Sequence, residues 1–408
     1  MTKNYLLIAY VILLFGNLWS QRFLTPTFRS VTTQTNVVYG ADTNYLGNLE
    51  NLKLDLYQPA NDVATNRPLI VFLHGGGFYD LAQTKSLPHI VDLCTRLASM
   101  GYVVASADYR IEPGSLLYTS NRMVVNAMHD AKAAIRFFKA NAVTYGLDTN
   151  RFIIGGESAG ASTAMNSAHI DKIQEVNFNR NLPYSRDTTV EGNGGNPGYN
   201  SIAKATMCLC GGTISGTNQP FFDTTSMEQN EEGAPYLLNV YGSNDLILPT
   251  VGSENISIKA RNIWLYNEEY PISDVGGLGH CPWSSFIFSP RLANRYMNTL
   301  ANLYIPRFAY TVLSLNFWKT DKFDGLSGDN NLFIFPNPSN GIINFPSNEI
   351  LRSMNELVVY DLLGRTVYNS TINSQEKSID LSFLNKGMYN ITGFSNNAKL
   401  FTSRFVIE

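Results

Sequence analysis

Residues 153–161 read Ile-Ile-Gly-Gly-Glu-Ser-Ala-Gly-Ala, and no other part of the chain constrains its fold as strongly. The apolar residues at the start of this segment are typical of a buried strand, and an Ala-rich helical pattern follows to Ala168. Glycines at positions 156 and 160, on either side of Ser158, fit a turn too sharp to accommodate a Cβ. A strand, a Gly-x-Ser-x-Gly turn and a helix together predict a nucleophile elbow, which leaves the serine hydroxyl exposed above a helix N-terminus.

Strand and helix patterns alternate on both sides of this elbow. Residues 32–57 alternate apolar and polar side chains, as antiparallel strands at the edge of a sheet do. Continuous apolar runs, typical of strands buried on both faces of a parallel sheet, occur at residues 69–73, 102–107, 205–209 and 236–241. Helical spacing is found up to residue 100, over 123–145 and over 290–304. The alternation predicts an α/β fold with a mostly parallel, doubly wound sheet and helices on both faces.

The length of 408 residues allows one large domain and a smaller module. The α/β pattern covers residues 31–315, and a polar linker is expected over residues 316–330. Residues 331–408 contain short strands and turns without helical periodicity, which predicts a small all-β sandwich. Residues 1–20, with Lys3 before a short apolar run, are predicted to be a signal peptide, and a retained membrane anchor is the alternative.

Composition excludes one class of function and permits disulfides. A net charge of −3 gives no electrostatic footprint for binding nucleic acid. Export would allow the four cysteines, Cys94, Cys208, Cys210 and Cys281, to form disulfides. Their pairing stays open, and one hypothesis is a Cys210–Cys281 bond that would tether the loop carrying His280.

A serine hydroxyl becomes a good nucleophile only when a base removes its proton. In an elbow fold the acid and then the histidine follow the serine in the chain, and only His169 and His280 come after Ser158. His169 is eleven positions further along the elbow helix, about 16 Å at 1.5 Å per residue, and cannot reach the hydroxyl. His280 ends a glycine-rich segment, residues 276–280, and is the predicted base.

Asp245 is the predicted acid that orients His280. It follows an apolar strand and a Gly-Ser-Asn turn, and catalytic groups of open α/β sheets lie beyond the carboxyl ends of the strands. Asp274 is the alternative, although it lies too close to His280 in the chain to arrive from another strand.

An oxyanion formed by attack of Ser158 on a carbonyl needs hydrogen-bond donors directed at it. The backbone N–H groups of Gly76, Gly77 and Ala159 are the predicted donors. The glycines follow a buried strand, where the absence of a Cβ allows the backbone to approach a substrate.

Several motifs occur in the order found in one known family: His74-Gly75-Gly76-Gly77-Phe78, Asp108-Tyr109-Arg110, Gly156-Glu157-Ser158-Ala159-Gly160, Gly242-Ser243-Asn244-Asp245 and Gly279-His280. Over roughly residues 32–307 the chain resembles the hormone-sensitive-lipase-like and carboxylesterase branch of the α/β-hydrolases. The resemblance implies a serine hydrolase that cleaves carboxylic esters through an acyl-enzyme, with no metal or organic cofactor. Glu157 together with Ala161 resembles the pattern of type B carboxylesterases, although the acid of those enzymes is usually glutamate. Hormone-sensitive-lipase relatives more often have aspartate before the serine and a helical cap, and no helical N-terminal cap is evident in this sequence.

The C-terminal region resembles the type A sorting domain of type IX secretion. The similarity lies in residues 335–341, 357–365 and 384–389, whose Pro-Asn-Pro, Asp-Leu-Leu-Gly and Lys-Gly segments also predict turns between strands. It implies the type IX machinery as a partner and a secreted or cell-surface location, with membrane contact only during export or through a surface anchor. An adhesive or carbohydrate-binding module is the alternative.

The sequence therefore predicts a secreted serine esterase acting on a small-molecule or polymer-borne ester. A serine peptidase on the same fold and a non-catalytic surface-binding protein with a hydrolase fold are the alternatives. The three-glycine run argues against a peptidase, and the complete set of Ser158, Asp245 and His280 argues against a binding protein.

Overall fold

The computed structural model describes residues 22–114, 121–176, 189–213, 222–228, 235–263, 265–273, 279–284, 290–314, 339, 341–344, 354–361, 365–372, 378–396 and 398–407. The predicted signal peptide and the predicted linker lie outside these ranges. The chain divides into two compact units. The first takes residues 1–316 except 229–233 and 260–268, and the second takes those two segments together with 317–408.

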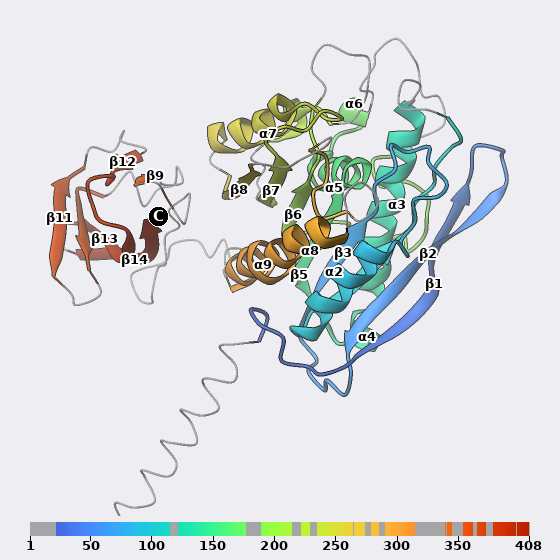
Figure 1. Ribbon diagram of the computed structural model, residues 1–408, viewed down its shortest axis with the longest axis horizontal. Helices are drawn as coiled ribbons and strands as arrows, with labels where there is room; N and C mark the ends of the chain where they lie inside the picture. The colour runs from blue at the N-terminus through green and yellow to red at the C-terminus, as the bar shows by residue number, and fades with distance from the viewer. Residues whose placement is uncertain are drawn as a thin grey trace, which may run out of the picture. The chain divides into compact units, whose positions relative to one another are not determined.

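An eight-stranded sheet runs through the α/β part of the chain in the order β1-β2-β4-β3-β5-β6-β7-β8 (Figure 1). Its strands are β1 (Val31–Thr43), β2 (Leu49–Pro59), β3 (Arg67–Leu73), β4 (Val103–Ala107), β5 (Leu147–Glu157), β6 (Ala205–Leu209), β7 (Tyr236–Gly242) and β8 (Asn267–Ile272). Strands β3 to β7 pair in parallel, whereas β1 with β2 and β2 with β4 pair antiparallel. The prediction of a mostly parallel sheet with an antiparallel edge is confirmed.

Helices pack along this sheet in two groups. Helix α3 contacts α5, while α2 contacts the π-helical turn Leu300–Tyr304 that joins α8 to α9 (Figure 1). The helices are α2 (Pro88–Ser99), α3 (Asn121–Ala140), α4 (Ala142–Tyr145), α5 (Ala159–His169), α6 (Ile173–Val176), the 3₁₀ turn Thr224–Ser226, α7 (Thr250–Asn262), α8 (Pro290–Thr299) and α9 (Ile305–Ser314). Of the helices in the described ranges, none has the length and apolar character needed to cross a bilayer.

Two helix boundaries differ from the prediction. The pattern over residues 123–145 is broken at Asn141, which separates α3 from α4. The last helix does not end at residue 304 but continues as α9 to Ser314. Pro306 cannot donate to an α-helical ladder, and the π-helical turn just before it lets the helix continue past the proline.

The segment after β4 is anchored by a buried ion pair. The guanidinium of Arg110 donates to Asp130 of α3, with Nη2 2.7 Å from Oδ1, and the Arg110 backbone N–H donates to Oδ2 at 2.7 Å. Asp42 at the end of β1 also contacts this guanidinium, at 3.1 Å. The side chain of Asp130 is fully buried and that of Arg110 nearly so. These bonds fix the carboxyl end of β4 against α3 and the sheet edge.

Replacing Asp130 with asparagine is expected to lower the free energy of unfolding by up to about 3–5 kcal/mol, because it removes the fully buried counter-charge of the Arg110 guanidinium and leaves only Asp42. Equilibrium denaturation in urea measures the change. Glu112→Gln is the matched control, because the Glu112–Arg122 pair is partly exposed and is expected to be worth less than about 1 kcal/mol. Equal losses in the two variants would contradict the prediction.

The second unit contains two antiparallel sheets around one core. A four-stranded sheet has the order β11-β10-β13-β14, and β12 pairs with β9. The strands are β9 (Ile342–Asn344), β10 (Glu356–Tyr360), β11 (Thr366–Thr371), β12 (Ser378–Asp380), β13 (Gly387–Ser395) and β14 (Ala398–Ile407). Ile343 and Ile379 from the small sheet share a buried cluster with Leu357, Ile391 and Phe405 from the large one. The all-β prediction for this region is confirmed.

Candidate active site

Ser158 lies in the predicted turn between β5 and α5. Its φ of 54° and ψ of −118° belong to neither a strand nor a helix. A Cβ at Gly156 would lie 2.6 Å from the carbonyl oxygen of Leu73, and one at Gly160 would overlap the same oxygen. The backbone N–H of Ser158 donates to the carbonyl of Leu209 at 2.9 Å, at the end of β6. The turn is therefore held by the strands on both of its sides.

Replacing Gly160 with alanine is expected to destabilise the fold, although alanine favours a helix over glycine by about 1 kcal/mol. Overlap of the new methyl group with the backbone of β3 is expected to outweigh this gain by about 1–3 kcal/mol or more. Thermal denaturation measures the sign. Gly114→Ala is the control, because a Cβ there would meet nothing closer than 3.6 Å. A raised melting temperature for the Gly160 variant would refute the prediction.

The structure brings Ser158, His280 and Asp245 together at the carboxyl ends of the strands. Nδ1 of His280 lies 2.7 Å from Oδ2 of Asp245, and its Nε2 lies 2.9 Å from Oγ of Ser158. Because a carboxylate only accepts hydrogen bonds, Nδ1 donates to Asp245 and Nε2 accepts from the serine hydroxyl. Asp245 and His280 are both buried. In this tautomer the imidazole can take the serine proton.

Asp245 is fixed by the loop that follows β7. Its Oδ1 accepts the backbone N–H groups of Ile247 and Leu248 at 2.9 and 2.8 Å, which leaves Oδ2 for His280. The alternative acid, Asp274, lies outside the described residues.

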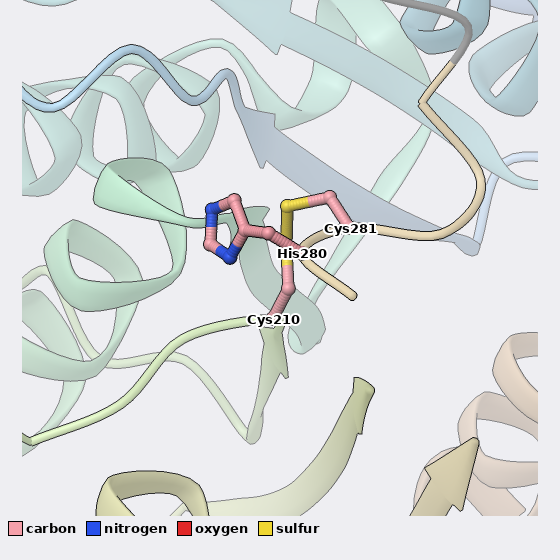
Figure 2. Close-up of side chains that lie close together, drawn as sticks. All are labelled: Cys210, His280 and Cys281. Carbon is pink, nitrogen blue, oxygen red and sulfur yellow. A yellow bond between two sulfur atoms is a disulfide. The ribbon is translucent and has the colours of Figure 1, made fainter. Parts of the chain in front are cut away.

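A disulfide adjoins the imidazole. Cys210, directly after β6, is bonded to Cys281, the residue after His280, with a Cα–Cα distance of 5.2 Å (Figure 2). The hypothesis of this pairing is confirmed, and Cys94 and Cys208 are buried free thiols. Burial raises the pKa of Cys208 to about 12.

The two bonded cysteines and His280 are not suited to hold a metal. The side-chain donor atoms of Cys210, His280 and Cys281 lie within 4.8 Å of one another. Both sulfurs are joined to each other, and both imidazole nitrogens are engaged by Asp245 and Ser158. The cluster therefore acts as a covalent tether on the loop that carries the imidazole.

The glycine loop after β3 runs alongside Ser158. A Cβ on Gly75 would lie 3.4 Å from the Cβ of Ser158. Gly76 and Gly77 follow with φ of 113° and 61°, and the carbonyl of Gly76 accepts the N–H groups of the next turn. Ala159 is the first residue of α5. The backbone groups of this loop and of the start of α5 thus lie on either side of the serine, and a role as oxyanion donors stays a prediction.

A second buried group was not anticipated from the sequence. Nε2 of His89, in α2, lies 2.7 Å from Oε1 of Glu157, and Nε1 of Trp283 donates to Oε2 of the same carboxylate at 2.9 Å. All three side chains are buried. The position of Glu157 beside Ser158 was the only signal in the sequence, because nothing local links residues 89 and 283 to the elbow.

A cavity of about 350 Å³ lies beside the antiparallel strands at one side of the sheet. It is lined by Glu50, Asn51, Leu52, Lys53, Asp108 and Tyr109. The start of β2 pairs antiparallel with the end of β4, and β4 lies next to β3. The cavity is therefore at the same edge of the sheet as the carboxyl end of β5, and most of its lining side chains are polar.

Comparison with known families is consistent with both units. The family model described as BD-FAE matches residues 54–193, and the model described as the secretion system C-terminal sorting domain matches residues 333–408. The first match includes the glycine loop and the elbow but ends before Asp245 and His280.

Two individual relatives show how far the sequence similarity extends. Neuroligin-like protein glit-1 of Caenorhabditis elegans is 29% identical over 138 residues, 33% of this chain and 16% of that protein. Esterase LipC of Mycobacterium tuberculosis is 23% identical over 269 residues, 62% of this chain and 60% of that protein. The chain thus spans less than two thirds of either relative's length.

A solved structure shares the fold. Thermogutta terrifontis esterase 2, phosphorylated by paraoxon, is 21% identical with a TM-score of 0.50, over 68% of this chain and 94% of that one. The chain therefore has the fold of this esterase, and residues 54–193 are similar to the BD-FAE family. Residues 333–408 match a secretion-system C-terminal sorting domain, which indicates export to the cell surface or the medium.

Proposed function

We propose that the protein is a serine esterase that hydrolyses carboxylic esters through an acyl-enzyme. The observation that supports this most directly is the chain of two hydrogen bonds from Asp245 through His280 to the hydroxyl of Ser158, at 2.7 and 2.9 Å. A nucleophile, a base and a group that orients the base are the parts that acyl transfer by a serine requires.

In acylation, Oγ of Ser158 attacks the ester carbonyl while Nε2 of His280 takes the hydroxyl proton. Asp245 keeps the imidazole in the required tautomer and stabilises the imidazolium as it forms. The backbone N–H groups of Gly76, Gly77 and Ala159 stabilise the oxyanion, and loss of one such donor costs about 10²–10³-fold in rate. His280 then protonates the departing alcohol.

In deacylation, His280 accepts a proton from a water molecule that attacks the acyl-serine. A second tetrahedral intermediate forms at the same oxyanion donors. It collapses as the His280 imidazolium returns the proton to Oγ of Ser158, which breaks the acyl bond and releases the carboxylic acid. Each step uses side chains and backbone groups of the chain itself.

The ester can belong to a small molecule or to a polymer outside the cell. The sorting domain supports the type IX secretion machinery as a partner during export.

A fluorophosphonate probe distinguishes the esterase from a non-catalytic surface protein with the same fold. The full chain is expected to be labelled at Ser158, because the activated hydroxyl attacks phosphorus as it attacks a carbonyl. Peptide mass spectrometry locates the adduct. An unlabelled Ser158 in folded protein would support the binding-protein alternative, and cleavage of peptides in preference to esters would support the peptidase.

A further inference from the structure

We propose that Glu157 and Trp283 are positioning residues, joining the turn that carries Ser158 to the loop that carries His280 through one buried carboxylate. This inference rests on the proposed esterase function. It assigns a task to side chains that do not touch the substrate or the reacting atoms.

The geometry of the carboxylate supports the proposal. Glu157 is the residue before Ser158, and Trp283 lies three residues after His280. Oε2 of Glu157 accepts the indole N–H of Trp283 at 2.9 Å, and Oε1 is 2.7 Å from Nε2 of His89. One side chain therefore connects the nucleophile's own strand to α2 and to the loop that carries the base.

Burial makes these bonds difficult to replace. Trp283 is only 1% exposed and Glu157 4%, so water cannot easily take over a lost partner. An unsatisfied buried acceptor costs about 1–3 kcal/mol, and more when the group is charged. Loss of the indole N–H would therefore leave Oε2 of this carboxylate without the partner that it has in the structure.

Charge strengthens the same connection. Burial alone would raise the pKa of Glu157, but the charge and hydrogen bond of His89, the bond from Trp283 and the charge of His280 together lower it. Burial alone would lower the pKa of His89, and the charge of Glu157 raises it. The charges of His89 and His280 therefore both favour the ionised form of this carboxylate.

The loop after His280 has two further attachments. Asp245 binds the imidazole itself, and the disulfide holds Cys281 to the end of β6. Trp283 adds a third, two residues after Cys281 in the chain. A shift of about 1 Å in a catalytic group can cost about 10²-fold in rate, so a loop carrying the base needs several fixed points.

The first experiment is Trp283→Phe in the full chain, which removes the indole N–H but keeps an aromatic ring. We expect kcat for a short acyl ester to fall about 10- to 100-fold with KM changed less than about twofold. Tyr102→Phe is the matched control. It removes a donor from a buried aromatic residue whose hydroxyl binds the Phe23 carbonyl at 2.9 Å, away from the site. Unchanged kcat in Trp283→Phe, or an equal fall in the control, would overturn the proposal.

The second experiment is Glu157→Gln, read out as kcat and KM for the same ester. Glutamine keeps the shape of the side chain but not its charge, so its bonds to His89 and Trp283 are expected to be weaker. We expect kcat to fall about 10-fold with KM changed less than about twofold. Unchanged kcat contradicts a positioning role even where Trp283→Phe fails to fold.

Failure of the inference is distinguishable from failure of the proposed function. If Ser158→Ala keeps full activity, the esterase assignment itself is wrong. If Ser158→Ala is inactive while Trp283→Phe and Glu157→Gln behave like the wild type, the assignment stands and only the positioning role is lost.

Discussion

Replacing Ser158 with alanine is expected to lower hydrolysis of a short acyl ester by about 10⁴-fold or more, with the fold intact. The variant removes the only atom that forms the acyl bond, while the backbone turn and both flanking glycines stay as they are. Initial rates with a chromogenic ester measure the effect, and circular dichroism checks the fold.

Ser162→Ala is the matched control for this experiment. Ser162 lies four residues further along α5, is buried, and its hydroxyl has no hydrogen-bond partner among the described residues. Its loss is expected to change kcat less than about threefold, since an unbonded hydroxyl contributes little. Retained hydrolysis in Ser158→Ala would falsify the assignment of the nucleophile, whatever the control does.

Removing the disulfide by Cys210→Ala with Cys281→Ala is expected to lower both stability and activity. The bond joins residues 71 positions apart, and closing such a loop in the unfolded chain is worth about 4 kcal/mol in the chain-entropy model. His280 is next to Cys281, so loss of the bond also frees the loop that carries the imidazole. At temperatures below the melting temperature of the variant, we expect kcat to fall by more than about tenfold.

Treatment with a reductant distinguishes the effect of this disulfide from that of the two free thiols. Wild-type protein is expected to lose activity and melting temperature in dithiothreitol, whereas the double alanine variant is already low and is expected not to respond. Cys94→Ala keeps the disulfide and is expected to respond as the wild type does. A double variant with wild-type kcat and stability would show that the tether has no role in catalysis.

Local patterns were sufficient to predict the sheet and the elbow. The runs at residues 69–73 and 205–209 coincide with β3 and β6, because strands buried on both faces need apolar residues at every position. The glycines around Ser158 are dictated by backbone contacts within one turn. Such features depend on residues close together in the chain, which a sequence records directly.

Only part of the candidate site could be predicted from the sequence. The order Ser158, Asp245, His280 narrowed the choice because just two histidines follow the serine. The bonds from Glu157 to His89 and Trp283 join residues 68 and 126 positions apart, and no periodicity marks partners so distant. The predicted end of the last helix, at residue 304, was wrong for a different reason. A π-helical turn has no sequence pattern from which it could be predicted.

The long separation of the reacting groups also governs when the site comes into being. Ser158 and His280 are 122 positions apart, and bringing such distant residues together carries an entropic cost of loop closure. A nascent chain that has completed only the elbow holds an ordinary alcohol. In the proposed mechanism, Ser158 therefore becomes an activated nucleophile only once the loop carrying His280 has joined the sheet.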